Sequence, residues 1–359
     1  MTGKIAFRIV LVLLCVLGLG IYIINKKSPE LFSSQTTEAV LEKLTMDQRI
    51  GQLFILGVEG KEMSQSTKDL ISRLHPGGIL LLGKNIGTKE QLKKFISDLQ
   101  SISLADTGLP LFIAIDQEGG TVSRIDWIEN TPQQEIGSAK QAYEVGRERG
   151  TSLSEVGINL NFSPLLDIAV TGDFIYSRTF GQNATETGEL AGKLVAGQKD
   201  GGILSTVKHF PGYGGIAFNP EDKMATLDKI PEFSQFQTAV LANPEFVMVT
   251  DVIYKELDPG IPFVFSKKAV DFLKKEVSGK YLVVSDDLSQ YSFLKNYSLT
   301  DIVSLPIKAG IDVLIFSGWR EPVESGPEAI KSALLSGKLS EQDINKSVLK
   351  IIELKEKIK

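Results

Sequence analysis

Residues 202–214 read GILSTVKHFPGYG, an apolar run that ends in a lysine and a histidine and then turns on proline and glycine. This pattern is typical of a buried strand that delivers polar side chains to a loop lying close to a ligand. His209 is one of only two histidines in the 359 residues. Apolar segments that end in an acid or a base recur along the chain, and this recurrence predicts an enzyme.

Short apolar segments alternate with segments of helical length on both sides of this stretch. Eight predicted strands are residues 53–56, 79–82, 111–115, 158–162, 203–207, 246–249, 281–284 and 313–316. Most are separated by helix-length segments such as 89–101, 141–156, 186–199 and 267–277, and an amphipathic helical pair follows in 327–359. Eight such units favour a single TIM-type (β/α)8 barrel of the α/β class. An open doubly wound sheet is the main alternative, but no glycine-rich dinucleotide fingerprint follows the first strand.

The first 37 residues differ in composition from the rest. Residues 9–24 form an uncharged apolar run with Lys or Arg on both sides. At about 1.5 Å per residue the run covers roughly 24 Å, and residues 5–8 bring it close to a hydrocarbon core of about 30 Å. Bulky residues occupy the place of a signal-peptidase site, so an uncleaved transmembrane anchor in 1–27 is favoured over a cleaved signal peptide. A polar linker, 28–37, would then join the anchor to a barrel in 38–359, which we expect on the extracytoplasmic side of the membrane.

Composition excludes some classes of partner. The net charge of −5 argues against nucleic acid, because binding to phosphates needs a basic face. A single cysteine can form no internal disulfide, and two histidines argue against a His-based metal site. We therefore expect no metal and no cofactor, whereas a neutral sugar remains compatible with this charge.

The ends of the predicted strands carry acids and one Lys-His pair. They lead into Asp116, residues 163–167, Lys208 with His209, Asp251, and residues 285–287. In a TIM barrel these ends meet at the active-site face. Several acceptors and donors suit a polyhydroxylated ligand, and a carboxylate nucleophile is typical of glycosidases.

At these positions the sequence resembles glycoside hydrolase family 3, in its short single-domain branch of β-N-acetylglucosaminidases. The matching stretches cover nearly all of residues 38–359. They are MDQRIGQLF (46–54), PGGILLLGKNI (76–86), AIDQEGGTVSRI (114–125), NLNFSPLLDI (159–168), YSRTFGQN (176–183), KHFPGYG (208–214), LDPGIPFVFSKKAV (257–270) and VVSDDLS (283–289). The resemblance implies a retaining, cofactor-free β-N-acetylhexosaminidase that removes terminal β-linked N-acetylglucosamine, or a related hexosamine, from cell-wall (peptidoglycan-type) glycan.

The same resemblance implies roles for individual residues. Asp286 matches the nucleophile of the family and has Asp287 as its neighbour; two solvated loop acids are the alternative. The matches to the sugar-binding residues are Asp116, Arg178, Lys208 and His209. For His209 a core histidine satisfied by backbone is the alternative. Arg124 and Asp167 are expected to be structural, paired with each other or with backbone.

The sequence departs from the family where the general acid/base should lie. The family carries an Asp-Ser-His triplet there, but residues 219–221 read NPE, and Tyr213 and Asp251 replace two further histidines of the family. Three hypotheses follow: Glu221 or Asp222 acts as acid/base, turnover is slow, or the barrel binds peptidoglycan-type glycan at the membrane without cleaving it. Retention of the nucleophile and the sugar-binding residues favours an enzyme.

Overall fold

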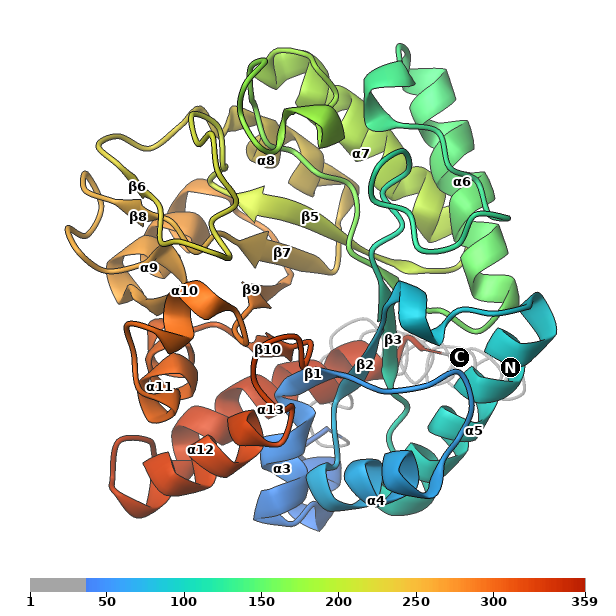
Figure 1. Cartoon of the computed structure of the whole chain (residues 1–359), viewed down its shortest axis with the longest axis vertical. Coiled ribbons are helices and arrows are strands. Elements are labelled where there is room, and N and C mark those ends of the chain that lie inside the picture. The colour runs from blue at the N-terminus through green and yellow to red at the C-terminus, as the bar shows by residue number, and fades with distance from the viewer. Residues whose placement is uncertain (1–36, 359) are drawn as a thin grey trace, which may run out of the picture. The chain divides into compact units, whose positions relative to one another are not determined.

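Eight parallel strands close into a barrel in the order β1-β10-β9-β7-β5-β4-β3-β2 in the computed structural model, which describes residues 37–358. Residues 44–358 form one compact unit, in which Figure 1 shows the helices arranged around the strands. The predicted TIM-type barrel is therefore confirmed. Of the described residues, none belongs to a helix long and apolar enough to cross a membrane. The predicted anchor (1–27) and most of the linker (28–37) lie outside the described residues.

The barrel strands fall where the apolar segments predict them, with two corrections. They are β1 (Phe54–Gly57), β2 (Gly78–Leu81), β3 (Phe112–Ile115), β4 (Leu160–Asn161), β5 (Leu204–Phe210), β7 (Phe246–Val249), β9 (Leu282–Asp287) and β10 (Val313–Phe316). First, β4 is shorter than the predicted 158–162, and at its end the side chain of Asn161 bonds the backbone of Gln117. Second, β5 runs through Phe210, so Lys208 and His209 lie in the strand instead of the following loop.

A register shift explains how β5 presents its polar pair. The pairing of β5 with β7 is regular up to Val207 and resumes, shifted, at Phe210. An irregularity of this kind re-aims side chains within a strand and is common beside active sites. A separate two-stranded pair, β6 (Thr226–Leu227) with β8 (Ile253–Tyr254), was not predicted from the sequence.

Helices follow most of the strands. They are α3 (Met46–Gln52), α4 (Gln65–Leu74), α5 (Lys89–Thr107), α6 (Ala139–Glu155), α7 (Ala184–Asp200), α8 (Ser234–Ala239), α9 (Lys267–Glu276), α10 (Tyr291–Leu294), α11 (Leu299–Ala309), α12 (Ser325–Leu335) and α13 (Glu341–Lys355). Many begin at a Ser, Thr or Asn whose side chain accepts a hydrogen bond from the first turn, as Thr88 does for α5 and Asn183 for α7. Helices α12 and α13 correspond to the predicted C-terminal pair.

The strands of the barrel are packed with apolar side chains. Every residue of β1, β2, β3, β7 and β10 is buried, as expected for parallel strands covered on both faces. Phe112 of β3 and Phe246 of β7 meet edge to face with ring centroids 5.4 Å apart. Such a filled interior leaves the ends of the strands as the place for a ligand site.

Candidate active site

A cavity of about 570 Å³ opens at the carboxyl ends of the strands. Its walls include every site residue predicted from the sequence: Asp116, Arg178, Lys208, His209, Glu221, Asp222 and Asp286. These residues come from β5, β9 and the loops that follow β3, β4 and β5. The fold therefore brings together all seven residues, which are spread over more than 150 positions of the chain.

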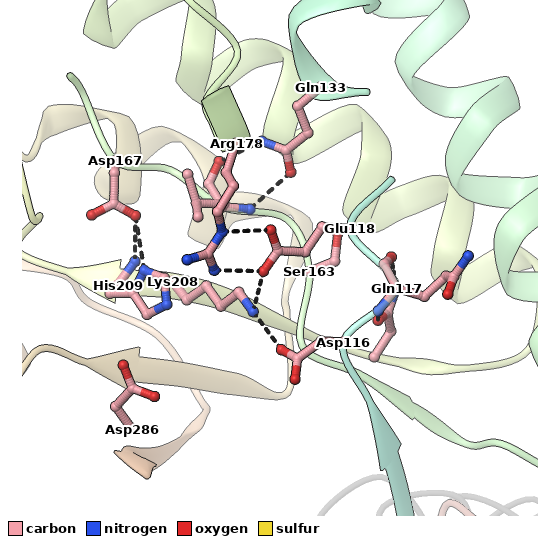
Figure 2. A network of polar contacts seen from close by, with 12 residues as sticks. Asp116, Gln117, Glu118, Gln133, Ser163, Asp167, Arg178, Lys208, His209 and Asp286 are labelled. Carbon is pink, nitrogen blue, oxygen red and sulfur yellow. Dashed lines mark hydrogen bonds and ion pairs between the residues drawn. The ribbon is translucent and has the colours of Figure 1, made fainter. Parts of the chain in front are cut away.

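The deepest part of the cavity holds a chain of ion pairs (Figure 2). Lys208 is 1% exposed, and its ammonium lies 2.8 Å from Oδ1 of Asp116 and 2.6 Å from Oε1 of Glu118. Arg178, at the end of a 3-10 turn (Tyr176–Arg178), donates to both oxygens of Glu118 at 2.7 and 3.0 Å. Such bidentate, charge-assisted bonds hold side chains in one orientation. Sequence reasoning missed Glu118, although it follows Asp116 by two residues at the same strand end.

These ion pairs fix the charges of the cluster. Burial alone would raise the pKa of Asp116, but Lys208 and Arg124 hold it below its usual value. The pKa of Glu118 is likewise well below its usual range, because Arg178 and Lys208 outweigh the effect of burial. Burial lowers the pKa of Lys208, yet its two acidic partners hold it above the usual value. The cluster thus presents fixed charged acceptors and donors to a ligand at neutral pH.

His209 is oriented by Asp167. Its Nδ1 lies 2.9 Å from Oδ2 of Asp167, and this carboxylate also accepts from the backbone N–H groups of His209 (3.2 Å) and Tyr213 (2.6 Å). The pairing of Asp167 with backbone agrees with expectation, but its pairing with Arg124 is wrong. Arg124 instead lines the cavity 3.7 Å from Asp116, because its loop folds back over the end of β3.

Asp286 and Asp287, the last residues of β9, have different surroundings. Asp286 lines the cavity and accepts hydrogen bonds from the Tyr213 hydroxyl (2.9 Å) and from the Asp287 N–H (2.9 Å). The Asp287 carboxylate is held by the hydroxyl and N–H groups of Ser289 and Ser317. Neither is a solvated loop acid. Four hydrogen bonds hold the Asp287 carboxylate, whereas Oδ2 of Asp286 accepts one from the Tyr213 hydroxyl and faces the cavity.

A buried acid stands beside Asp286. Asp251, 3% exposed after β7, accepts a hydrogen bond from Gln290 through Oδ2, and its Oδ1 has no hydrogen-bond partner in residues 37–358. Burial, and then the charge of Asp286, raise the pKa of Asp251 well above its usual value. The Asp251 N–H lies 3.4 Å from the Tyr213 hydroxyl. Both effects disfavour the ionised form of Asp251. Sequence reasoning gave neither Asp251 nor Tyr213 a role.

Glu221 lies on the loop that follows β5. Its N–H donates to Oδ1 of Asn219 at 3.1 Å, and the Ser292 N–H donates to its carbonyl oxygen at 2.9 Å, which ties the loop to α10. Although Glu221 is exposed overall, its carboxyl lines the cavity. Burial of this group, followed by the charge of Asp286, raises its pKa to about 7. A carboxyl that is half protonated near neutral pH can both give and take a proton.

Within residues 37–358, no group of three or more His, Cys, Asp or Glu side chains is arranged to hold a metal ion.

Comparison with known proteins identifies the family. The model of the glycosyl hydrolase family 3 N terminal domain matches residues 45–354. This chain belongs to glycosyl hydrolase family 3. The family predicted from the motifs is confirmed, as is the enzyme class, a glycosidase similar to β-N-acetylhexosaminidases.

Relatives of the chain bear similar names. Beta-hexosaminidase LpqI of Mycobacterium tuberculosis is 27% identical over 332 residues, which are 86% of this chain and 82% of that protein. The beta-hexosaminidase of Psychromonas ingrahamii is 30% identical over 279 residues, 73% of this chain and 81% of that protein.

Two solved structures share the barrel. A family 3 β-N-acetylglucosaminidase from Paenibacillus superposes with a TM-score of 0.82 at 31% identity, over 88% of this chain; the match spans 62% of that longer chain. The β-N-acetylhexosaminidase of Beutenbergia cavernae superposes with a TM-score of 0.78 at 25% identity, over 88% of this chain and 99% of its own.

Proposed function

We propose that the chain is a retaining glycoside hydrolase that removes terminal β-linked N-acetylglucosamine, or a related hexosamine, from cell-wall glycan through a covalent glycosyl-enzyme. The observation that carries this proposal is the cavity itself. It places Asp286, fixed by Tyr213, in one space with the ion-paired cluster of Lys208 and with Glu221. The names of the relatives, which are β-hexosaminidases and β-N-acetylglucosaminidases, support the choice of sugar.

In this proposal the reaction has two displacement steps. Asp286 attacks the anomeric carbon of the terminal sugar while Glu221 gives its proton to the departing oxygen, so the glycosidic bond breaks as the glycosyl-enzyme bond forms. Glu221, now ionised, then takes a proton from water, and the resulting hydroxide displaces Asp286 from the same carbon. Two inversions leave the product with the β configuration of the substrate.

We assign the binding of the terminal sugar to the ion-paired residues around Lys208. Asp116, Arg178, Lys208 and His209 line the cavity, and we assign to them hydrogen bonds with the hydroxyls of the sugar. Lys208 is paired with Asp116, Arg178 with Glu118 and His209 with Asp167. These pairs hold the side chains in place, so the sugar must fit donors and acceptors that are already oriented.

The surroundings of the loop favour Glu221 over Asp222 as the acid/base. The carboxyl of Glu221 is buried enough for its pKa to reach about 7, whereas the Asp222 side chain is 69% exposed and lies 4.0 Å from Arg320. An acid that must protonate a leaving group at neutral pH needs a raised pKa, which the surroundings of Glu221 provide.

A barrel that binds peptidoglycan-type glycan with little or no turnover is the second candidate. The observation that favours it is the loop after β5, which holds Asn219, Pro220 and Glu221 where the family carries its Asp-Ser-His triplet.

The stereochemistry of the first product tests the proposal. We expect the full chain, in detergent, to hydrolyse an aryl N-acetyl-β-glucosaminide and to release β-N-acetylglucosamine first, followed by slow mutarotation, as read from the anomeric proton by NMR. An α product would contradict the double displacement. Tight binding of the glycoside without any hydrolysis would favour the second candidate.

The proposal also places the barrel on the extracytoplasmic side of a membrane, anchored by residues 9–24. Its support is the uncharged apolar run in the sequence. External protease should then degrade the barrel in cells stripped of their wall, and protection of the barrel would contradict this location.

A further inference from the structure

The hydroxyl of Tyr213 contacts the proposed nucleophile, yet the two displacement steps give it no chemical part. Tyr213 lies in the loop after β5, is 3% exposed, and places its hydroxyl 2.9 Å from Oδ2 of Asp286. We propose that Tyr213 is a catalytic residue of the second displacement, in which its hydroxyl stabilises the Asp286 carboxylate as water releases the sugar. This inference rests on the proposed glycosidase function and assigns a further group to its second step.

The direction of this hydrogen bond follows from its surroundings. The nucleophile attacks as a carboxylate, which has no proton to give, so the Tyr213 hydroxyl is the donor to Asp286. The backbone N–H of Asp251 lies 3.4 Å from the same hydroxyl and, being a donor, occupies an acceptor position of that oxygen. Burial raises the pKa of Tyr213 well above its usual value. The phenol therefore keeps its proton at neutral pH and directs it to Asp286.

The donor is held in place before any substrate binds. The ring of Tyr213 packs edge to face against His209 and Phe174, with ring centroids 4.9 and 5.5 Å apart. The backbone N–H of Tyr213 donates to Oδ1 of Asp167 at 2.6 Å. A donor that is already oriented needs no reorganisation when charge develops on its acceptor, and such donors stabilise transition states most effectively.

The charge on Asp286 changes in opposite directions in the two steps. In the first step an electron pair of the carboxylate forms the bond to the anomeric carbon, and the negative charge disappears. In the second step the oxygen of water bonds to that carbon, Glu221 takes the proton of the water, and the electron pair of the breaking bond returns to Asp286. The donors that meet the returning charge are the Tyr213 hydroxyl at Oδ2 and the Asp287 N–H at Oδ1. A hydrogen bond that favours the charged carboxylate therefore assists the second step and gives no such help to the first.

Tyr213→Phe tests this role, because it removes the hydroxyl and keeps the packed ring. With the full chain in detergent and a dinitrophenyl N-acetyl-β-glucosaminide, we expect kcat to fall about 10²-fold, as when one preorganised donor is lost. The ratio kcat/KM should fall about tenfold or less, because it reports only the steps up to the glycosyl-enzyme. The glycosyl-enzyme should then accumulate. It would be detected as a stoichiometric burst of dinitrophenolate and, by mass spectrometry, as a sugar on the peptide that contains Asp286.

Tyr143→Phe is the matched control, since the Tyr143 hydroxyl also donates to an aspartate, Asp200, at 2.7 Å, but from α6 and away from the cavity wall. It should keep both wild-type constants. An unchanged kcat in Tyr213→Phe, or a loss in kcat/KM as large as that in kcat, would overturn the role of Tyr213. The burst amplitude counts the active enzyme, so a misfolded fraction cannot imitate the expected difference between the two constants. Failure of the proposed function looks different: the wild type itself would cleave no glycoside, and that result would overturn both.

Discussion

Asp286→Gly is expected to lower kcat/KM for an aryl N-acetyl-β-glucosaminide by about 10⁴-fold or more. The variant has no carboxylate at the position where Tyr213 now fixes one, 2.9 Å away. Asp287 cannot take over, because Ser289 and Ser317 hold its carboxylate through four hydrogen bonds. Initial rates with a good leaving group, which needs little protonation, measure the effect of the nucleophile alone.

Azide distinguishes a lost nucleophile from a damaged fold. In Asp286→Gly the space of the missing side chain can admit azide, which would attack the anomeric carbon as the aryloxide departs and yield the α-glycosyl azide. We expect azide to restore turnover and this product to appear by NMR. Asp301→Asn, a change of an acid in the first turn of α11, is the control and should behave as wild type without azide. A β-glycosyl azide, or a variant that retains wild-type activity, would remove Asp286 from the role of nucleophile.

The barrel could be predicted because a strand buried on both faces appears in the sequence as a short run of apolar residues. Strands β7 and β10 coincide with their predicted ranges, since each is a run of four buried apolar residues. The prediction was weakest at β4. There Asn161 uses its side chain to bond the backbone of Gln117, and this contact across 44 residues shows no periodicity in the sequence. Apolar character marks where a strand lies, but partners distant in the chain decide where it ends.

The same limit applies to the candidate site. Strand ends pointed to Asp116, Lys208 and Asp286, because the barrel gathers these ends at one face. The role of Glu118 could not be inferred, since its partners Arg178 and Lys208 are 60 and 90 residues further along the chain. Arg124 was assigned to the wrong partner for the same reason. The charged residues of a site can be predicted from the sequence, but which of them form ion pairs depends on the tertiary structure.

The two residues that replace histidines of the family meet in space. The hydroxyl of Tyr213 lies 3.4 Å from the backbone N–H of Asp251 and donates to Asp286. Burial and the charge of Asp286 raise the pKa of Asp251. Asp286 therefore has beside it the phenol of Tyr213 and an acid whose ionised form is disfavoured. The two replacements therefore lie together beside Asp286, and Tyr213 bonds to it directly.

Glu221→Gln is expected to separate substrates by their leaving groups. For a disaccharide, whose departing sugar needs a proton, kcat/KM should fall by about 10²–10⁴-fold. For a dinitrophenyl glycoside, which departs without protonation, kcat/KM should change little, because this ratio reports the steps up to formation of the glycosyl-enzyme. The wild-type value for the disaccharide should decrease above pH 7, since Glu221 must be protonated to act and its pKa is about 7. Glutamine cannot titrate, so this decrease should disappear in the variant.

Asp222→Asn is the matched control, since Asp222 is the next residue of the same loop and its side chain is 69% exposed. It removes a carboxylate of the cavity wall without changing the hydrogen bonds that Asn219 makes with Glu221. If Asp222→Asn shows the dependence on leaving group and Glu221→Gln does not, the proton-transfer role belongs to Asp222. Equal losses for both substrates in Glu221→Gln would mean that this side chain supports the loop and transfers no proton, because a purely structural defect cannot sense the basicity of the leaving group.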